Sequence, residues 1–225
     1  MSKKVLMLHG YAQSASIFSA KTGGLRKSLA KAGYETIYVN APMRLQSDQL
    51  HNPESESELY GWWQYGAPDY TVDDALETIQ KAIEGQEIEG IIGFSQGAGL
   101  GGYIVAQYKK LIPSLKFGVF FSGFKLMPQR FEAAYVDKIE LPSLHVIGEL
   151  DTVVEEGRSL ALWDVAQEDK RTMLKHHGGH FVPNSKDYVS KVLNWIASVT
   201  AEQEVKKAEV DDDDIFAAID NMGKA

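Results

Sequence analysis

The sequence contains no cysteine among its 225 residues. This absence excludes disulfide bonds, thiolate metal ligands and a cysteine nucleophile, and it fits a protein of the cytoplasm, with the nucleus as an alternative. Long apolar runs are also absent. Residues 1–10 have only four consecutive apolar residues after two lysines, whereas a signal peptide needs roughly 7–15 and a membrane span about 18. We therefore expect neither a signal peptide nor a membrane span.

An excess of basic residues is missing as well. The chain has 31 acidic and 23 basic residues, a formal net charge of −8. Residues 200–225 hold eight of the acids and only three lysines, so the remainder is close to neutral. Because a nucleic-acid surface requires clustered lysine and arginine, we predict no nucleic-acid partner. A small-molecule substrate is the expectation instead.

Short apolar runs alternate with amphipathic segments along residues 1–199. The runs expected to be strands are 5–8, 36–39, 90–94, 117–121, 144–148 and 171–176. The segments expected to be helices are 25–32, 72–83, 97–110, 153–166 and 185–199. This alternation predicts a single α/β domain, with a mostly parallel central sheet and helices on both faces.

Two segments interrupt that pattern. Residues 43–70 are irregular and include Trp62, Trp63 and Tyr65, which makes the segment either a lid or pocket wall, or a long loop packed on the body. Residues 200–225 form an acidic tail. We expect a solvated tail there, with a short amphipathic helix as the alternative, because apolar residues between 215 and 222 recur at helical spacing.

Residues 93–102 read GFSQGAGLGG and fit two motifs. One is the glycine-rich dinucleotide loop, which requires its first glycine directly after a strand and an acidic residue about 20 positions later. Here the expected strand ends three residues before Gly97, and the first acidic residue after it, Glu132, lies 35 positions on. The dinucleotide interpretation fails on both requirements.

The other motif, G-x-S-x-G, fits without adjustment. It is typical of a nucleophile elbow, a sharp turn between a strand and a helix that exposes a serine hydroxyl. In such hydrolases an acid and then a histidine follow the serine along the chain. Glu149 and Asp151 follow one expected strand, and His176, His177 and His180 follow the next. We favour Asp151 as the acid and His180 as the base, with Ser95 as the nucleophile.

A tetrahedral oxyanion requires donors fixed in advance. In this class they are the N–H after the nucleophile and an N–H from the loop after an early strand. The sequence assigns these donors to the backbone of Gln96 and, within the stretch HGYAQ, of Tyr11. Neither a metal nor a cofactor is required by this chemistry. A non-catalytic scaffold acting through the acidic tail is the alternative from another class, and the complete order of Ser95, Asp151 and His180 argues against it.

The stretches LMLHGYAQS, GFSQGAGLGG, LHVIGELDTVV and HHGGHFVPNS together resemble the fungal serine hydrolase family, which is related to the ovarian-cancer-associated gene 2 protein. The resemblance covers residues 4–199 and implies an α/β-hydrolase fold with Ser95, Asp151 and His180 as the triad. It also implies carboxylic-ester hydrolysis, and in some relatives thioesterase activity that releases polyketide acyl chains. The tail 200–225 lies outside the resemblance.

The acyl group is expected to be small or apolar. Aromatic residues suited to a pocket wall are Trp62, Trp63, Tyr65 and Phe181. No lysine or arginine occurs between Arg44 and Lys81, where eight acidic residues stand. A phosphate-rich carrier such as coenzyme A is usually bound by basic residues, so we predict a neutral ester or thioester.

Overall fold

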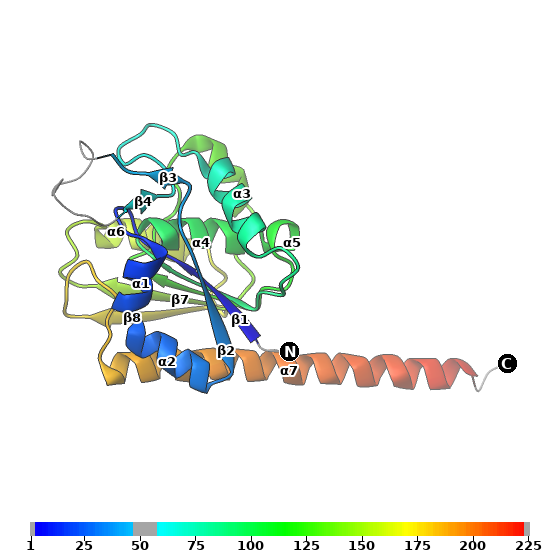
Figure 1. The fold of residues 1–225 in the computed structure, drawn as a ribbon. Coiled ribbons are helices and arrows are strands. Elements are labelled where there is room, and N and C mark those ends of the chain that lie inside the picture. Colours follow the sequence, from blue (N-terminus) through cyan, green and yellow to red (C-terminus); the bar gives the residue numbers. More distant parts are fainter. Residues whose placement is uncertain (1–2, 47–57, 223–225) are drawn as a thin grey trace.

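The computed structural model describes residues 3–46 and 58–222. Their centre is a six-stranded parallel sheet with the strand order β2-β1-β5-β6-β7-β8 (Figure 1). Its strands are β1 (Lys3–Leu8), β2 (Tyr34–Val39), β5 (Gly90–Phe94), β6 (Phe117–Phe121), β7 (Ser143–Gly148) and β8 (Arg171–His176). The six strands expected from the sequence are all present, and the predicted α/β fold is confirmed. A small antiparallel pair, β3 (Met43–Arg44) and β4 (Tyr60–Gly61), stands apart from this sheet.

Helices cover both faces of the sheet. One face carries α1 (Ala15–Lys21), α2 (Gly23–Lys31) and the long α7 (Lys186–Met222). The other carries α3 (Val72–Ala82), α4 (Gln96–Ala106), α6 (Glu156–Asp164) and the 3₁₀ helix η2 (Gln129–Tyr135), with the short α5 (Tyr108–Leu111) continuing from α4.

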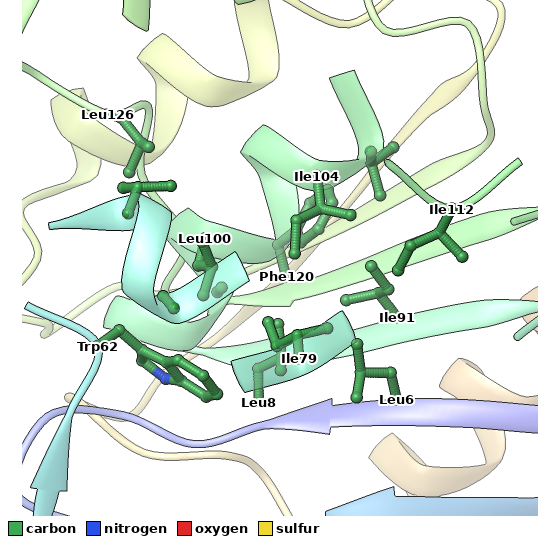
Figure 2. Packing of buried hydrophobic residues seen from close by; sticks show 14 of the residues in the cluster. Leu6, Leu8, Trp62, Ile79, Ile91, Leu100, Ile104, Ile112, Phe120 and Leu126 are labelled. Atoms are coloured by element: carbon green, nitrogen blue, oxygen red, sulfur yellow. The ribbon is translucent and has the colours of Figure 1, made fainter. Parts of the chain in front are cut away.

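The core forms two layers because successive side chains of a strand point to opposite faces. In β1, Leu6 and Leu8 join the layer under α3 and α4, whereas Val5 and Met7 join the layer under α2 and α7. Figure 2 shows the first layer, with the indole of Trp62 beside Leu8 at its edge. Strands β5, β6 and β7 are buried along their whole length, which explains their uninterrupted apolar sequences.

Four helices differ from the sequence-based expectations. Helices α1 and η2 were not predicted. Helix α6 begins at Glu156 rather than at 153, because the Asp151 carboxylate accepts hydrogen bonds from the N–H groups of Val153 and Val154 and holds them in a turn. Helix α7 does not end at 199 but continues to Met222 and extends beyond the body (Figure 1). No glycine or proline stands between 200 and 222 to end it.

The buried histidine His145 of β7 links stability to pH. Its ring lies between Phe120 and Trp163, and its Nε2 is 3.0 Å from the Ser143 hydroxyl. Burial, with a smaller contribution from the charge of Arg171, lowers the pKa of His145 to about 3. In the unfolded chain this histidine is protonated below about pH 6.5, whereas in the folded chain it stays neutral. The free energy of unfolding therefore falls as the pH falls below 6.5.

We expect His145 to contribute a slope of about 1.4 kcal/mol per pH unit to the free energy of unfolding between pH 6 and pH 4. Urea unfolding of the wild type and of His145→Leu across this range measures the contribution. The variant should lose that part of the slope, whatever its stability at pH 7. Parallel pH dependences for the two proteins would contradict the assignment.

Candidate active site

Three adjacent strands are followed by strained turns at their carboxyl ends. Ala12 follows β1, Ser95 follows β5 and Ser122 follows β6, with φ angles of +54°, +53° and +47°. Residues other than glycine rarely adopt positive φ, and such strain concentrates at functional sites. The turns therefore mark this edge of the sheet as the candidate active site.

Ser95 stands at the turn between β5 and α4. Its N–H donates to the Phe121 carbonyl at 2.9 Å, continuing the β5–β6 ladder by one residue. Helix α4 then starts immediately, so close to β1 that a Cβ on Gly97 would lie 2.3 Å from the Leu8 carbonyl oxygen. Glycine at 97 therefore permits direct contact between the helix backbone and the β1 backbone, in agreement with the predicted elbow.

The loops after β7 and β8 bring two further side chains to Ser95. His180 Nε2 lies 3.0 Å from Ser95 Oγ, and His180 Nδ1 lies 2.8 Å from Asp151 Oδ2. The Phe94 ring packs on the imidazole with the ring centroids 4.8 Å apart. The three side chains predicted from the sequence thus form one hydrogen-bonded chain, in the order expected for a nucleophile, a base and an acid.

The Asp151 carboxylate is almost fully enclosed, with 1% of its side chain exposed. Burial alone would raise its pKa. The hydrogen bonds from His180 and the Val154 N–H, together with the nearby Ser122 hydroxyl, outweigh burial and hold the pKa of Asp151 below its ordinary value. The carboxylate is therefore charged near neutral pH and suited to orient the imidazole.

Ser122 is a part of the site that the sequence analysis missed. Its side chain is buried, and its Oγ makes no hydrogen bond of normal geometry among the described residues. It nevertheless lies close enough to Asp151 to lower the pKa of that carboxyl. In the sequence, Ser122 stands in the stretch SGF directly after an apolar strand. That pattern does not reveal that the backbone of the serine has a positive φ angle.

The remaining candidates lie elsewhere. His176 is buried and its Nδ1 accepts the Gly178 N–H. His177 is exposed, and its Nδ1 is hydrogen-bonded to a carboxylate oxygen of Glu149, the alternative acid. Neither histidine is hydrogen-bonded to Ser95. His9, in the loop after β1, is buried, with both ring nitrogens in hydrogen bonds to backbone groups.

The two oxyanion donors expected from the sequence belong to different segments: Gln96 directly follows Ser95, and Tyr11 follows Gly10, where an added Cβ would lie 3.4 Å from the Ser95 Cβ. The Gln96 N–H belongs to the first turn of α4, where no helix carbonyl can accept it. The Tyr11 N–H donates none of the hydrogen bonds found within 3–46 and 58–222. The Gly10 N–H, by contrast, donates to Gln13 Oε1 at 3.2 Å. Tyr11 and Gln96 therefore remain the predicted pair.

The aromatic residues expected to line a pocket fall into two groups. Trp62 and Trp63 are 0% and 3% exposed, so their indoles pack in the core and have no surface to offer a substrate. Tyr65 and Phe181 are 72% and 50% exposed. The expectation is therefore corrected for the two tryptophans and kept for Tyr65 and Phe181. Part of the possible lid, residues 47–57, lies outside the described residues.

Within the described ranges, no three His, Asp or Glu side chains are grouped to hold a metal ion. The same ranges contain no helix with the length and apolar character needed to cross a membrane.

A parallel sheet with a Ser–His–Asp chain beyond its carboxyl edge defines the α/β-hydrolase class. The family described as "Serine hydrolase (FSH1)" matches residues 1–192. "Family of serine hydrolases 3" from Saccharomyces cerevisiae is 42% identical, covering 99% of this chain and 98% of that protein. "Esterase OVCA2" from Xenopus tropicalis is 34% identical, covering 80% of this chain and 86% of that protein. The chain belongs to the FSH1 family of serine hydrolases, which confirms the resemblance seen in the sequence.

Solved structures support the same fold. Acyl-protein thioesterase 2 from Zea mays superposes with a TM-score of 0.65 at 19% identity, covering 88% of this chain and 94% of that one. A carboxylesterase from Bacillus cereus gives a TM-score of 0.60 at 15% identity, covering 88% and 89%. At such low identity these likenesses establish the α/β-hydrolase architecture alone.

Proposed function

We propose that this serine hydrolase cleaves carboxylic esters or thioesters of a small or apolar acyl group, in the cytoplasm or nucleus. The observation that carries the proposal is the hydrogen-bonded chain from Ser95 through His180 to the enclosed carboxylate of Asp151. Its relatives add support, because the similar proteins from frog and zebrafish are both described as esterases.

The reaction follows from this geometry. Ser95 Oγ attacks the substrate carbonyl while His180 Nε2 takes the hydroxyl proton, and Asp151 holds the Nδ1–H and stabilises the imidazolium. The N–H groups of Tyr11 and Gln96 donate to the tetrahedral oxyanion. His180 then gives its proton to the departing alcohol or thiol, leaving an acyl-serine. A water molecule activated by His180 attacks this ester, releases the acid and restores Ser95.

The surroundings favour a neutral substrate. In the described part of the segment between Arg44 and Lys81, acidic residues are paired with arginines from outside it or at its boundary: Glu58 with Arg44, and Asp69 and Asp73 with Arg130. No basic residue of that segment is available for a phosphate-rich carrier. The exposed rings of Tyr65 and Phe181 offer apolar surface instead. Together these features support an apolar acyl group.

A panel of matched oxygen and sulfur esters with acyl chains from C2 to C16 tests this function, alongside labelling by a fluorophosphonate probe. We expect labelling, turnover without added metal, and a preference for uncharged leaving groups over coenzyme A. Lack of both labelling and turnover would indicate a non-catalytic scaffold. A higher kcat/KM for a coenzyme A ester than for the matched alkyl thioester would overturn the neutral-substrate proposal.

The acidic tail is proposed to lie outside the catalytic domain, with a boundary later than residue 199. Thr200 is buried, and Gln203 Nε2 donates to the Lys116 carbonyl at 2.9 Å next to β6. Deleting residues 204–225 should therefore keep kcat/KM within about three-fold and change the melting temperature little, because this end of α7 extends beyond the body (Figure 1) and such helix ends contribute little to stability. Deletion from residue 200 should cost more stability. Loss of activity in the shorter deletion would show that the tail acts at the site.

A further inference from the structure

The side chain of Gln96 connects the nucleophile turn to a segment more than thirty residues away. Its Oε1 accepts the Trp62 N–H at 2.8 Å, and its Nε2 donates to the Trp63 carbonyl at 2.8 Å. The side chain is 4% exposed. Both ends of one buried amide are thus satisfied by consecutive residues of the segment that follows β4.

Trp62 extends this connection to the loop after β1. Its indole Nε1 donates to the His9 carbonyl at 2.8 Å, and its ring lies 5.3 Å from the His9 ring. His9 in turn accepts the Ala41 N–H at Nε2 and donates from Nδ1 to the Gly10 carbonyl. Burial lowers the pKa of His9 to about 4, so the ring is neutral near pH 7 and fits one donor and one acceptor.

The two ends of this network are the two expected sources of oxyanion donors. Gln96 supplies one N–H directly, and Tyr11, next to Gly10, supplies the other. The Tyr11 ring also lies against Gly61, where a Cβ would approach it to 2.8 Å. The segment 60–63 therefore contacts both loops, through backbone, ring and side-chain groups that are largely buried.

We propose that the Gln96 amide and the Trp62 indole are positioning residues that set the spacing of the two oxyanion donors. The inference rests on the proposed function and extends it to residues whose side chains do not touch the substrate. Oxyanion donors act through geometry fixed before the reaction, and small displacements weaken them. Segment 60–63 is accordingly a buried support behind the two loops, and it carries the chain on to Tyr65, whose ring lies 5.7 Å from the Tyr11 ring.

The glutamine amide supplies both the acceptor and the donor required here, and it stays uncharged at every pH of the assay. Gln96→Glu keeps the shape but places a carboxylate against the Trp63 carbonyl. A protonated glutamic acid would restore the donor, and burial beside a carbonyl raises the pKa of such a carboxyl. The defect of Gln96→Glu should therefore diminish as the pH falls, which a purely structural role would not produce.

The test compares kcat and KM of Gln96→Glu with those of the wild type from pH 8 to pH 5, as a ratio at each pH. At pH 8 we expect kcat of Gln96→Glu to be about 10- to 100-fold lower than that of the wild type, with KM changed little. As the pH falls, the kcat of the variant should approach that of the wild type. Gln96→Met, which lacks both hydrogen bonds, should show a low ratio at every pH. Gln107→Glu is the matched control, because its amide donates to the Ala134 carbonyl at 3.0 Å at the far end of α4.

A kcat ratio for Gln96→Glu that does not change with pH would overturn the inference, and so would an equal loss of kcat in Gln107→Glu. Neither result would affect the proposed function as long as the wild type turns over an ester. Failure of the wild type to turn over any ester would instead contradict the function itself. If the Gln96 variants do not fold, Trp62→Phe decides, since it keeps a six-membered aromatic ring and deletes the indole donor, and thermal unfolding of the variant reports the cost of the smaller side chain. We expect a roughly 10-fold lower kcat at unchanged KM, and an unchanged kcat would overturn the inference.

Discussion

Ser95→Ala is expected to lower kcat/KM by at least about 10⁴-fold and to abolish labelling by a fluorophosphonate probe. Removing the nucleophile removes the acyl-enzyme route, and only binding and oxyanion stabilisation remain to assist water. The alanine deletes one hydroxyl from a side chain that is 8% exposed, so the fold should be retained. Steady-state kinetics, probe labelling and thermal unfolding on the same preparation separate loss of chemistry from loss of structure.

The histidines provide the control for this prediction. His180→Ala should lose activity to a similar extent, because the effects of residues that act as a unit do not add. His177→Ala should keep activity within a few-fold, since its side chain is exposed, and polar contacts at the protein surface contribute little to stability. Continued labelling of Ser95→Ala, or loss of turnover in His177→Ala with full turnover in His180→Ala, would contradict the assignment of roles.

The chain order of the site could be predicted because each part follows a strand. In a parallel sheet the carboxyl ends of all strands lie at one edge, so residues just after β5, β7 and β8 converge however far apart they are in sequence. Ser95, Asp151 and His180 are such residues. Glycine at 97 was equally readable, because four glycines near the start of a helix are unfavourable unless another backbone lies close.

The supporting contacts could not be read in the same way. The hydrogen bonds of Gln96 to Trp62 and Trp63 depend on where a loop packs, and no local pattern encodes that placement. The density of aromatic residues in 43–70 therefore fitted a pocket wall and a loop packed on the body equally well. The indoles of Trp62 and Trp63 are buried, and both belong to the core. Ser122 was missed for a related reason: its role arises from a strained backbone angle, and serine after a strand is common.

The first residue of α6 and the last residue of α7 also differ in how far a local sequence pattern determines them. The start of α6 moved from 153 to 156 because the Asp151 carboxylate accepts the N–H groups of Val153 and Val154 in a local turn. The same carboxylate is bound to His180, a partner 29 residues away in the sequence. The extension of α7 through residue 222, by contrast, follows from a local sequence signal, because residues 200–222 lack the glycine or proline that ends helices. The acidic composition of residues 200–222 favoured a solvated tail, but it does not by itself end a helix.

Gly97→Ala is expected to reduce kcat/KM by at least about 10²-fold and to destabilise the fold by about 1–3 kcal/mol. The new Cβ would lie 2.3 Å from the Leu8 carbonyl oxygen and 2.4 Å from that of His9. Both atoms belong to the backbone where β1 ends, so neither can rotate away, and the start of α4 must shift instead. That shift displaces the Gln96 N–H from the Tyr11 loop while leaving every triad side chain chemically intact.

The matched control is Gly157→Ala in the first turn of α6, where an added Cβ meets nothing within 4 Å. It should be neutral or stabilise by up to about 0.5–1 kcal/mol, as expected for alanine replacing glycine in a helix. Urea unfolding and kcat/KM for both variants separate the effect on stability from the effect on catalysis. After correction for the unfolded fraction, folded Gly97→Ala should still have a low kcat/KM.

Wild-type kcat/KM in folded Gly97→Ala would show that the contact between α4 and β1 does not determine the oxyanion geometry. A proportional loss of stability and activity would reduce Gly97 to a packing role, whereas a larger loss of activity identifies the backbone contact at Gly97 as part of what places the nucleophile and its oxyanion donor.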